Sequence, residues 1–305
     1  MGHVFVTGLA TLDFVFRLDQ MPVGGEKFQA QDVSIVGGGG AANAAVAVAR
    51  LGGQASLATR LGDDAVGEMI LSELRNEGVI LDQIHCAPAG ISAFSSIYVA
   101  NNGDRQIVNF RGAGLSDDPQ FLEMPASVDV ALADTRWNAG AQKTLNTAKS
   151  RGILGVLDAE SPVHPDLIKT ASHIAFSRQG LTDLTAEPDL IKALTAVSAA
   201  TSAWVCATDG ASGVYFVDAK RIENIPAFPV TAIDTLAAGD VWHGAFCLGL
   251  AEGRDEHSAM EFANAAAALK CTQFGGRKGC PDRRATENLL KKVQEDGQAN
   301  TKPGR

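Results

Sequence analysis

The chain has 305 residues, 46% of them hydrophobic, and a formal net charge of -9. This length is enough for one sizeable core, whereas the acidic balance disfavours binding to nucleic acid backbones and to anionic membranes. No apolar run approaches the roughly 18 residues of a membrane span, and the five cysteines include no C-x-x-C motif. We therefore expect a cytoplasmic protein without a disulfide framework that contacts neither nucleic acid nor a membrane.

Apolar strand-like runs alternate with helical patterns along most of the chain. Strands are predicted at residues 4–8, 55–59, 128–133, 153–157, 174–176 and 203–207. Helices are predicted at residues 41–51, 66–76, 139–151, 165–171, 189–200, 238–251 and 258–271. This order is typical of an α/β fold whose mainly parallel sheet carries helices on both faces.

Two stretches, residues 11–35 and 91–111, interrupt this alternation because they have strand patterns without helices between them. The sequence Asn-Asn-Gly-Asp at residues 101–104 predicts a hairpin turn in the second stretch. We expect both stretches to form a small β-sheet lid at the carboxyl ends of the main strands, where α/β proteins bind ligands. The chain is predicted to be a single domain over residues 1–298, followed by a loose C-terminal tail at 299–305.

The sequence DTLAAGD at residues 234–240 follows an extended segment and begins an apolar helix. Small residues leave the amides of Ala237, Ala238 and Gly239 uncovered, which favours anion binding at the helix start. Asp240 in the first turn could accept a proton from a hydroxyl that attacks a phosphate bound there. The pattern is also compatible with a plain helix start whose dipole an acidic side chain compensates.

Two glycine clusters accompany this motif. Residues 37–40 are all glycine and lead into a helix, so the backbone can approach a ligand closely and Asn43 can bond a polyol. Thr208, Gly210 and Gly213 follow a predicted strand, a position that commonly lines a cofactor cleft. The cluster at residues 37–40 matches neither the dinucleotide nor the Walker fingerprint, and it is also compatible with a tight turn that serves helix packing alone. The pattern at residues 208–213 is weak evidence by itself.

Together these motifs resemble the ribokinase-like (PfkB-type) carbohydrate kinases. The N-terminal signature of that family is similar to residues 37–67 and its C-terminal signature to residues 234–246. The resemblance extends over nearly the whole chain. It implies a three-layer α/β/α core, a small β-sheet lid that often forms a homodimer interface, and transfer of a phosphoryl group from ATP, with Mg²⁺, to a sugar hydroxyl.

The same resemblance implies roles for individual residues. Asp240 would be the catalytic base, and the amides of Ala237, Ala238 and Gly239 would stabilise the transferring phosphoryl group. The sugar contacts would be Asp13, Gly38, Gly39 and Asn43, and the nucleotide contacts would be Thr208, Gly210, Gly213, Gly239 and Asn264. A K⁺ ion would bind backbone carbonyls near Asp234 and Gly275. Two departures from the family pattern stand out: Ala237 replaces a common glycine, and Ser177-Arg-Gln-Gly180 replaces the N-x-x-E motif of the magnesium site.

Lys27, Asn109 and Arg136 bear on the choice of sugar. They lie in sequence patterns that resemble bacterial 6-deoxy-6-sulfofructose kinases, as do residues 175–181 (AFSRQGL) and 270–279 (KCTQFGGRKG). The resemblance implies that the three side chains hold a sulfonate while the C1 hydroxyl is phosphorylated, and two cations suit a substrate with a fixed anion. The alternatives are a fructokinase, ketohexokinase or other ribokinase-like sugar kinase, and a non-catalytic sugar-binding protein.

Overall fold

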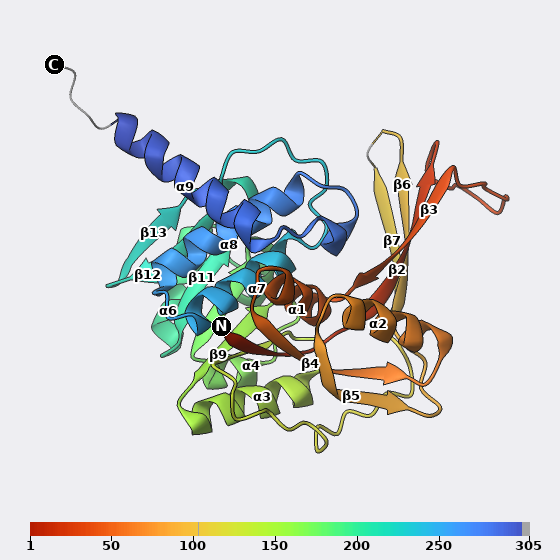
Figure 1. Cartoon of the computed structure of the whole chain (residues 1–305), viewed down its shortest axis with the longest axis horizontal. Helices are drawn as coiled ribbons and strands as arrows, with labels where there is room; N and C mark the ends of the chain where they lie inside the picture. The colour runs from red at the N-terminus through yellow and green to blue at the C-terminus, as the bar shows by residue number, and fades with distance from the viewer. Residues whose placement is uncertain (103, 301–305) are drawn as a thin grey trace.

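The computed structural model describes residues 1–102 and 104–300, and Figure 1 shows a main body with a small sheet standing beside it. Within these residues the main sheet has nine strands in the order β13-β12-β11-β10-β9-β8-β1-β4-β5. Strands from β5 to β11 pair in parallel, and β12 and β13 extend the sheet antiparallel. Their bounds are β1 His3–Thr7, β4 Gln54–Gly62, β5 Ile80–Ala87, β8 Val130–Ala133, β9 Leu154–Ala159, β10 His173–Ser177, β11 Trp204–Thr208, β12 Val214–Asp218 and β13 Arg221–Ile225.

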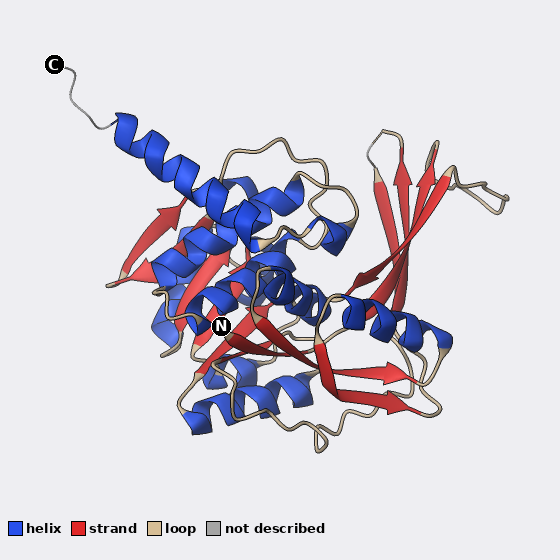
Figure 2. Ribbon diagram, in the orientation of Figure 1, coloured by secondary structure: helices blue, strands red, loops and turns tan. Residues whose placement is uncertain are grey.

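Helices cover both faces of this sheet (Figure 2), which confirms the predicted three-layer architecture. Successive strand residues point to opposite faces, so Val156 of β9 joins the core beneath α1, α7 and α8 whereas Leu157 joins the core beneath α3, α4 and α6. The helix bounds are α1 Gly40–Arg50, α2 Ala65–Asn76, α3 Asn138–Arg151, α4 Pro165–Thr170, α5 Arg178–Thr185, α6 Leu190–Ala200, α7 Ala238–Ala251, α8 Glu256–Cys271 and α9 Arg283–Asn300.

The elements that the sequence patterns did not predict are β5, α5, the β12–β13 hairpin and α9. β5 is an edge strand whose residues are mostly half-exposed, and α5 buries only two of its residues, so their apolar periodicity is weak. α9 contains residues 299 and 300 of the predicted tail, and residues 301–305 lie outside the described part of the chain. No helix of the described residues is long and apolar enough to cross a membrane.

The small sheet is built from the two stretches that were predicted to form a lid, and we call it the lid. Its strands are β2 (Thr11–Leu18), β3 (Asp32–Gly38), β6 (Phe94–Ala100) and β7 (Arg105–Phe110), in the order β3-β2-β6-β7. Asp13 pairs with Ser95, and Ser95 pairs with Asn109. Because directly paired residues project from the same face, the register places three polar side chains in one row. Residue 103, in the predicted hairpin turn, lies outside the described part of the chain.

Candidate active site

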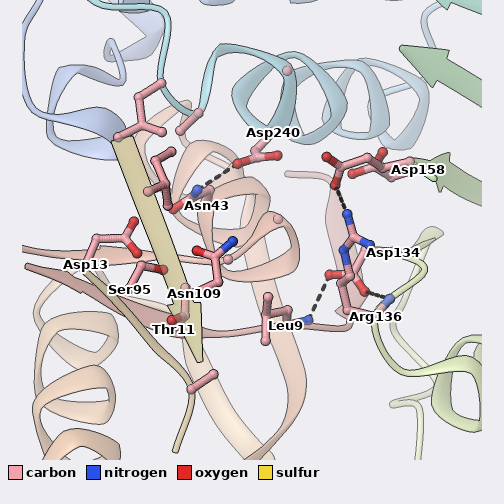
Figure 3. Close-up of a pocket in the computed structure, with 18 of the residues that line it drawn as sticks. Leu9, Thr11, Asp13, Asn43, Ser95, Asn109, Asp134, Arg136, Asp158 and Asp240 are labelled. Carbon is pink, nitrogen blue, oxygen red and sulfur yellow. Dashed lines mark hydrogen bonds and ion pairs between the residues drawn. The ribbon is translucent and has the colours of Figure 1, made fainter. Parts of the chain in front are cut away.

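A cavity of about 430 Å³, the central cavity, lies between the lid and the carboxyl ends of β8 and β9. The start of α7 forms a further wall, and Figure 3 shows the side chains that point into the space. The cavity collects most of the predicted site residues: Asp13, Gly39, Asn43, Asn109, Arg136, Thr208, Ala237, Ala238, Gly239 and Asp240. Residues more than 200 positions apart in sequence therefore line one space.

Asp240 stands in the first turn of α7 and hydrogen-bonds across the cavity to α1. Nδ2 of Asn43 donates to Oδ2 of Asp240 across 2.7 Å. Burial raises the pKa of Asp240 to about 6, the Asn43 hydrogen bond opposes that rise, and the charges of Glu160 and Asp134 add to it. A carboxylate with a pKa close to physiological pH is suited to accept a proton from a hydroxyl.

The backbone before Asp240 forms the helix start that the DTLAAGD motif predicts. Ala237 has φ 65, in the left-handed region, and the N–H of Ala238 donates to the carbonyl of Thr235 across 3.2 Å. Apart from its chain neighbours and the backbone of its own helix, an added Cβ on Gly239 would meet no atom of the described protein within 4 Å. The backbone at Gly239 is thus open to the cavity, where an anion could approach the end of the helix dipole.

Three carboxylates converge next to Gly40. A Cβ added to Gly40 would lie 3.6 Å from one oxygen each of Asp134, Asp158 and Asp240. Desolvation raises the pKa of Asp158 well above its ordinary value, and the neighbouring charge of Asp240 raises it further. Nδ1 of His243 lies 3.4 Å from Oδ1 of Asp158, and burial lowers the pKa of His243 to about 4, so this imidazole is neutral at pH 7.

The lid contributes Asp13 and Asn109, which lie on one face of its sheet in neighbouring positions of the strand pairing. Glycines allow the lid to approach α1 closely. An added Cβ on Gly38 would lie 2.4 Å from Oδ2 of Asp13, so Gly38 makes room for that carboxylate rather than lining the cavity. Gly39, with φ 90, would place a Cβ 2.4 Å from the carbonyl oxygen of Leu9. Burial raises the pKa of Asp13, and a hydrogen bond with Ser95 opposes the rise.

Arg136 enters the central cavity from the loop after β8. Its Nη2 donates to Oε2 of Glu160 across 2.6 Å, and its Nη1 donates to the carbonyl of Ser161 across 2.9 Å. Asp134 fixes the backbone around it by accepting the N–H groups of Leu9 (2.8 Å), Ala41 (3.2 Å) and Arg136 (2.8 Å). Arg136 is therefore held in place, with part of its charge balanced by Glu160.

The prediction for Lys27 is not supported. Lys27 is exposed in the loop at residues 19–31 and does not line the central cavity. Thr11 pairs with Gly38 at the cavity end of the lid, whereas Arg17 pairs with Asp32 at the opposite end. The loop therefore leaves the sheet about 20 Å from Thr11, since a strand rises about 3.3 Å per residue. The sequence pattern could not show at which end of the lid the loop lies.

A second cavity of about 720 Å³, the side cavity, lies between α7, α8 and the end of β11. The predicted nucleotide contacts Thr208, Gly210, Gly213, Gly239 and Asn264 all line it. The amide of Asn264 is already engaged, since Oδ1 accepts from Nε1 of Trp242 (2.8 Å) and Nδ2 donates to the carbonyls of Ile225 and Pro226. The two cavities share the residues Ser177, Thr208, Thr235, Ala238 and Gly239, so they meet at the start of α7.

Comparisons with known proteins assign this architecture to a family. Residues 1–283 match the profile of the pfkB family carbohydrate kinases. The chain is 32% identical to the ribokinase of Bacillus subtilis, over 95% of this chain and 100% of that protein. It is 26% identical to the fructokinase of Vibrio alginolyticus, over 91% of this chain and 95% of that protein.

The chain belongs to the pfkB family of carbohydrate kinases. A crystal structure from Agrobacterium tumefaciens with a provisional ribokinase assignment superimposes with a TM-score of 0.90 at 36% identity, covering 96% of this chain and 99% of that one. Kinases of this family are ATP-dependent phosphotransferases that act on sugar hydroxyls. The alternative of a non-catalytic sugar-binding protein is therefore not supported.

The magnesium motif of these kinases is absent from this chain in structure as in sequence. Oγ of Ser177 accepts the N–H of Gly180 across 3.0 Å and caps α5, so neither residue supplies a carboxylate. Among the described residues no group of three His, Cys, Asp or Glu side chains could hold a metal ion. Asp158 and Glu160 line the central cavity together with Ser177, and carboxylates are the ligands that suit the Mg²⁺ that accompanies ATP.

Sequence reasoning missed four charged residues that line the central cavity: Arg111, Asp134, Asp158 and Glu160. Asp134 and Asp158 stand at the carboxyl ends of β8 and β9, and Glu160 follows β9 directly. Charged residues at the end of a buried parallel strand were the signal that could have identified them. Arg111 comes directly after β7, two residues beyond Asn109.

Proposed function

We propose that this kinase transfers the γ-phosphoryl group of ATP to the C1 hydroxyl of 6-deoxy-6-sulfofructose and forms the 1-phosphate. The observation that carries the proposal is the position of Arg136 and Asn109 on the wall of the cavity that also contains Asp240. Figure 3 shows the two side chains coming from walls other than the helix that carries Asp240. One end of a sugar can therefore meet a cation while the other end meets the base.

In this proposal the sugar occupies the central cavity and ATP the side cavity, and the reacting atoms meet at Ala238 and Gly239. Asn43 orients Asp240 through the 2.7 Å hydrogen bond, and its own Oδ1 has no partner within the described protein, so it can accept a sugar hydroxyl. Asp240 takes the proton of the attacking hydroxyl, and the amide of Gly239 stabilises the charge that develops on the phosphoryl group. Mg²⁺ supplies further charge neutralisation at the phosphates when bound, with Asp158, which lines the central cavity, as its proposed protein contact.

A sulfonate at Arg136 agrees with the charges of the cavity. A guanidinium has several N–H groups, and the bonds to Glu160 and Ser161 leave others for an anion. Arg111 lines the same cavity and adds a second cation, replacing Lys27 in the proposed anion contact. Phosphorylation of a neutral sugar is the competing function. Glu160 already balances part of the charge of Arg136, and the relatives carry the names ribokinase and fructokinase.

The substitution Arg136→Ala separates these two functions. We expect kcat/KM for sulfofructose to fall by about 10–100-fold, the loss that removal of a charged hydrogen bond implies, while kcat/KM for fructose changes by less than about 3-fold. Arg75→Ala is the matched control, because Arg75 is exposed on α2 and pairs with Glu68 on the surface. Full activity of Arg136→Ala on sulfofructose would overturn the proposed substrate.

We also propose that the kinase is a homodimer that pairs through the outer face of the lid. On the face opposite Asp13, the residues Val33, Ile35 and Val108 are 52%, 42% and 56% exposed, and an apolar patch of this kind favours association. Ile35→Glu should then convert a dimer to a monomer in size-exclusion chromatography with light scattering. A wild-type protein that elutes as a monomer would contradict this proposal.

A further inference from the structure

Lys270 is a fully buried lysine at the end of α8, with 0% of its side chain exposed. Its Nζ donates to the backbone carbonyl of Asp234 across 2.7 Å and to Oδ2 of the same residue across 3.1 Å. Oδ2 of Asp234 also accepts the N–H groups of Gly275 and Gly276 across 3.1 and 2.9 Å. The ammonium thus lies on Asp234, one of the two residues near which the family resemblance implies a K⁺ ion, and the other, Gly275, is bonded to the same carboxylate.

An additional K⁺ ion in contact with Asp234 does not fit beside Lys270. The single negative charge of that carboxylate is already balanced by a buried ammonium, and a second cation beside it would meet the repulsion of the first at low dielectric. The carbonyl oxygen of Asp234, an oxygen of the type that coordinates alkali cations, is also taken by Nζ of Lys270.

We propose that the ammonium of Lys270 replaces the monovalent cation, so that this kinase needs no K⁺ for activity. Lys270 acts as a positioning residue, because it reaches the reacting atoms only through the loop that precedes α7. Oδ1 of Asp234 accepts the N–H of Leu236 across 2.9 Å, and Leu236 is followed by Ala237 at the left-handed start of α7. A cation fixed on Asp234 therefore fixes the loop that presents Gly239 and Asp240.

Backbone hydrogen bonds also join the end of α8 to the segment that precedes α7. The carbonyl of Cys271, the residue after Lys270, accepts the N–H groups of Ile233 and Asp234 across 2.7 and 3.1 Å. The end of α8 is thus joined to the segment before α7 by backbone hydrogen bonds as well as by the buried ion pair. The lysine occupies its place whenever the chain is folded, whereas a bound K⁺ ion would depend on its concentration.

The test compares wild type, Lys270→Ala and Lys270→Met in tetramethylammonium chloride with the same proteins in KCl or NH₄Cl at equal ionic strength. Thermal unfolding midpoints are measured for all three, and turnover is measured with whichever of sulfofructose, fructose and ribose the wild type phosphorylates. The midpoints do not depend on the identity of the sugar, so failure of the proposed substrate and failure of this proposal are distinguishable. Lys149→Ala is the matched control, since Lys149 is exposed on α3.

We expect wild type and Lys149→Ala to have the same turnover and midpoint in all three salts. Lys270→Ala should lose about 10–100-fold in turnover in tetramethylammonium, as expected for a lost charged hydrogen bond, and should regain activity and a higher midpoint with K⁺ or NH₄⁺. Lys270→Met fills the space of the lysine without its charge, so K⁺ or NH₄⁺ should restore less of its turnover than they restore in Lys270→Ala. Activation of the wild type by K⁺ would overturn the proposal, even where Lys270→Ala does not fold. A folded Lys270→Ala whose turnover and midpoint are the same with all three cations would also overturn it.

Discussion

Nδ2 of Asn43 donates to Oδ2 of Asp240 across 2.7 Å, which joins the first turn of α1 to the first turn of α7. The bond brings the glycine-rich loop before α1 and the DTLAAGD loop before α7 to one point. It also opposes the effect of burial on the pKa of Asp240, which stands at about 6. The proposed base is therefore positioned and tuned by a residue 197 positions away in the sequence.

Replacing Asp240 by Asn should abolish most of the phosphoryl transfer. The amide keeps the shape of the side chain but cannot accept the proton, so kcat should fall by about 10²–10⁴-fold. In the wild type, kcat/KM should rise with pH through about 6 as Asp240 loses its proton. Initial rates of ADP release across pH 5–8 measure both effects, and unchanged turnover in Asp240→Asn would reject Asp240 as the base.

The same substitution should stabilise the fold at neutral pH. Folding raises the pKa of Asp240 from 3.8 to about 6, so between these values the folded chain binds more protons than the unfolded chain. The contribution of Asp240 to stability is therefore greatest at or below about pH 4 and is lost as the pH rises through 6. Asp240→Asn removes this loss and should be more stable than wild type at pH 8 by about 1–2 kcal/mol, after allowance for screening through the open cavity. Urea unfolding at pH 8 and pH 4.5 measures the difference in unfolding free energy between Asp240→Asn and wild type, and this difference should be smaller at pH 4.5.

Gly40→Ala should separate activity from stability. Gly40 opens α1 with an ordinary backbone conformation, and alanine favours a helix over glycine by up to about 1 kcal/mol. The new methyl group would lie 3.6 Å from oxygens of Asp134, Asp158 and Asp240, in contact but without a clash. We expect an unfolding free energy equal to or above that of wild type, with a turnover at least about 10-fold lower because the methyl group occupies the space of the reacting hydroxyl. An active Gly40→Ala enzyme would show that the sugar does not approach these carboxylates.

Much of this site could be predicted from local sequence. Asp240 and Asn43 stand in motifs that also define the helices carrying them, so local spacing was sufficient to find them. The position of Asp158 and Glu160 at the end of a predicted strand was a local signal, but whether they share a cavity with Asp240 depends on β9 being a central strand, and strand order is not contained in any local pattern. The contact between Lys270 and Asp234 spans 36 residues and depends on how α8 packs, so a buried ammonium at that place could not be read from the chain.

Ala237→Gly should have little effect, although glycine is common in the family at this position. Ala237 adopts φ 65, a conformation that costs a non-glycine residue about 1–2 kcal/mol, while glycine adds a backbone entropy cost of roughly 0.5–1 kcal/mol on folding. The two effects partly cancel, so the unfolding free energy should rise by between about 0 and 1.5 kcal/mol. Because the amide keeps its position, turnover should stay within about 2-fold of wild type. A large loss of activity would show that the methyl group itself shapes the site.

The central claim is that the cavity holding Asp240 selects a sugar with a fixed anion. The most direct measurement is kcat/KM of the wild-type enzyme for 6-deoxy-6-sulfofructose, fructose and ribose, from ATP-dependent ADP release under one set of conditions. We expect kcat/KM for sulfofructose to exceed that for both neutral sugars by at least about 10-fold, the contribution of one charge-assisted hydrogen bond. Equal or better use of ribose or fructose would contradict it.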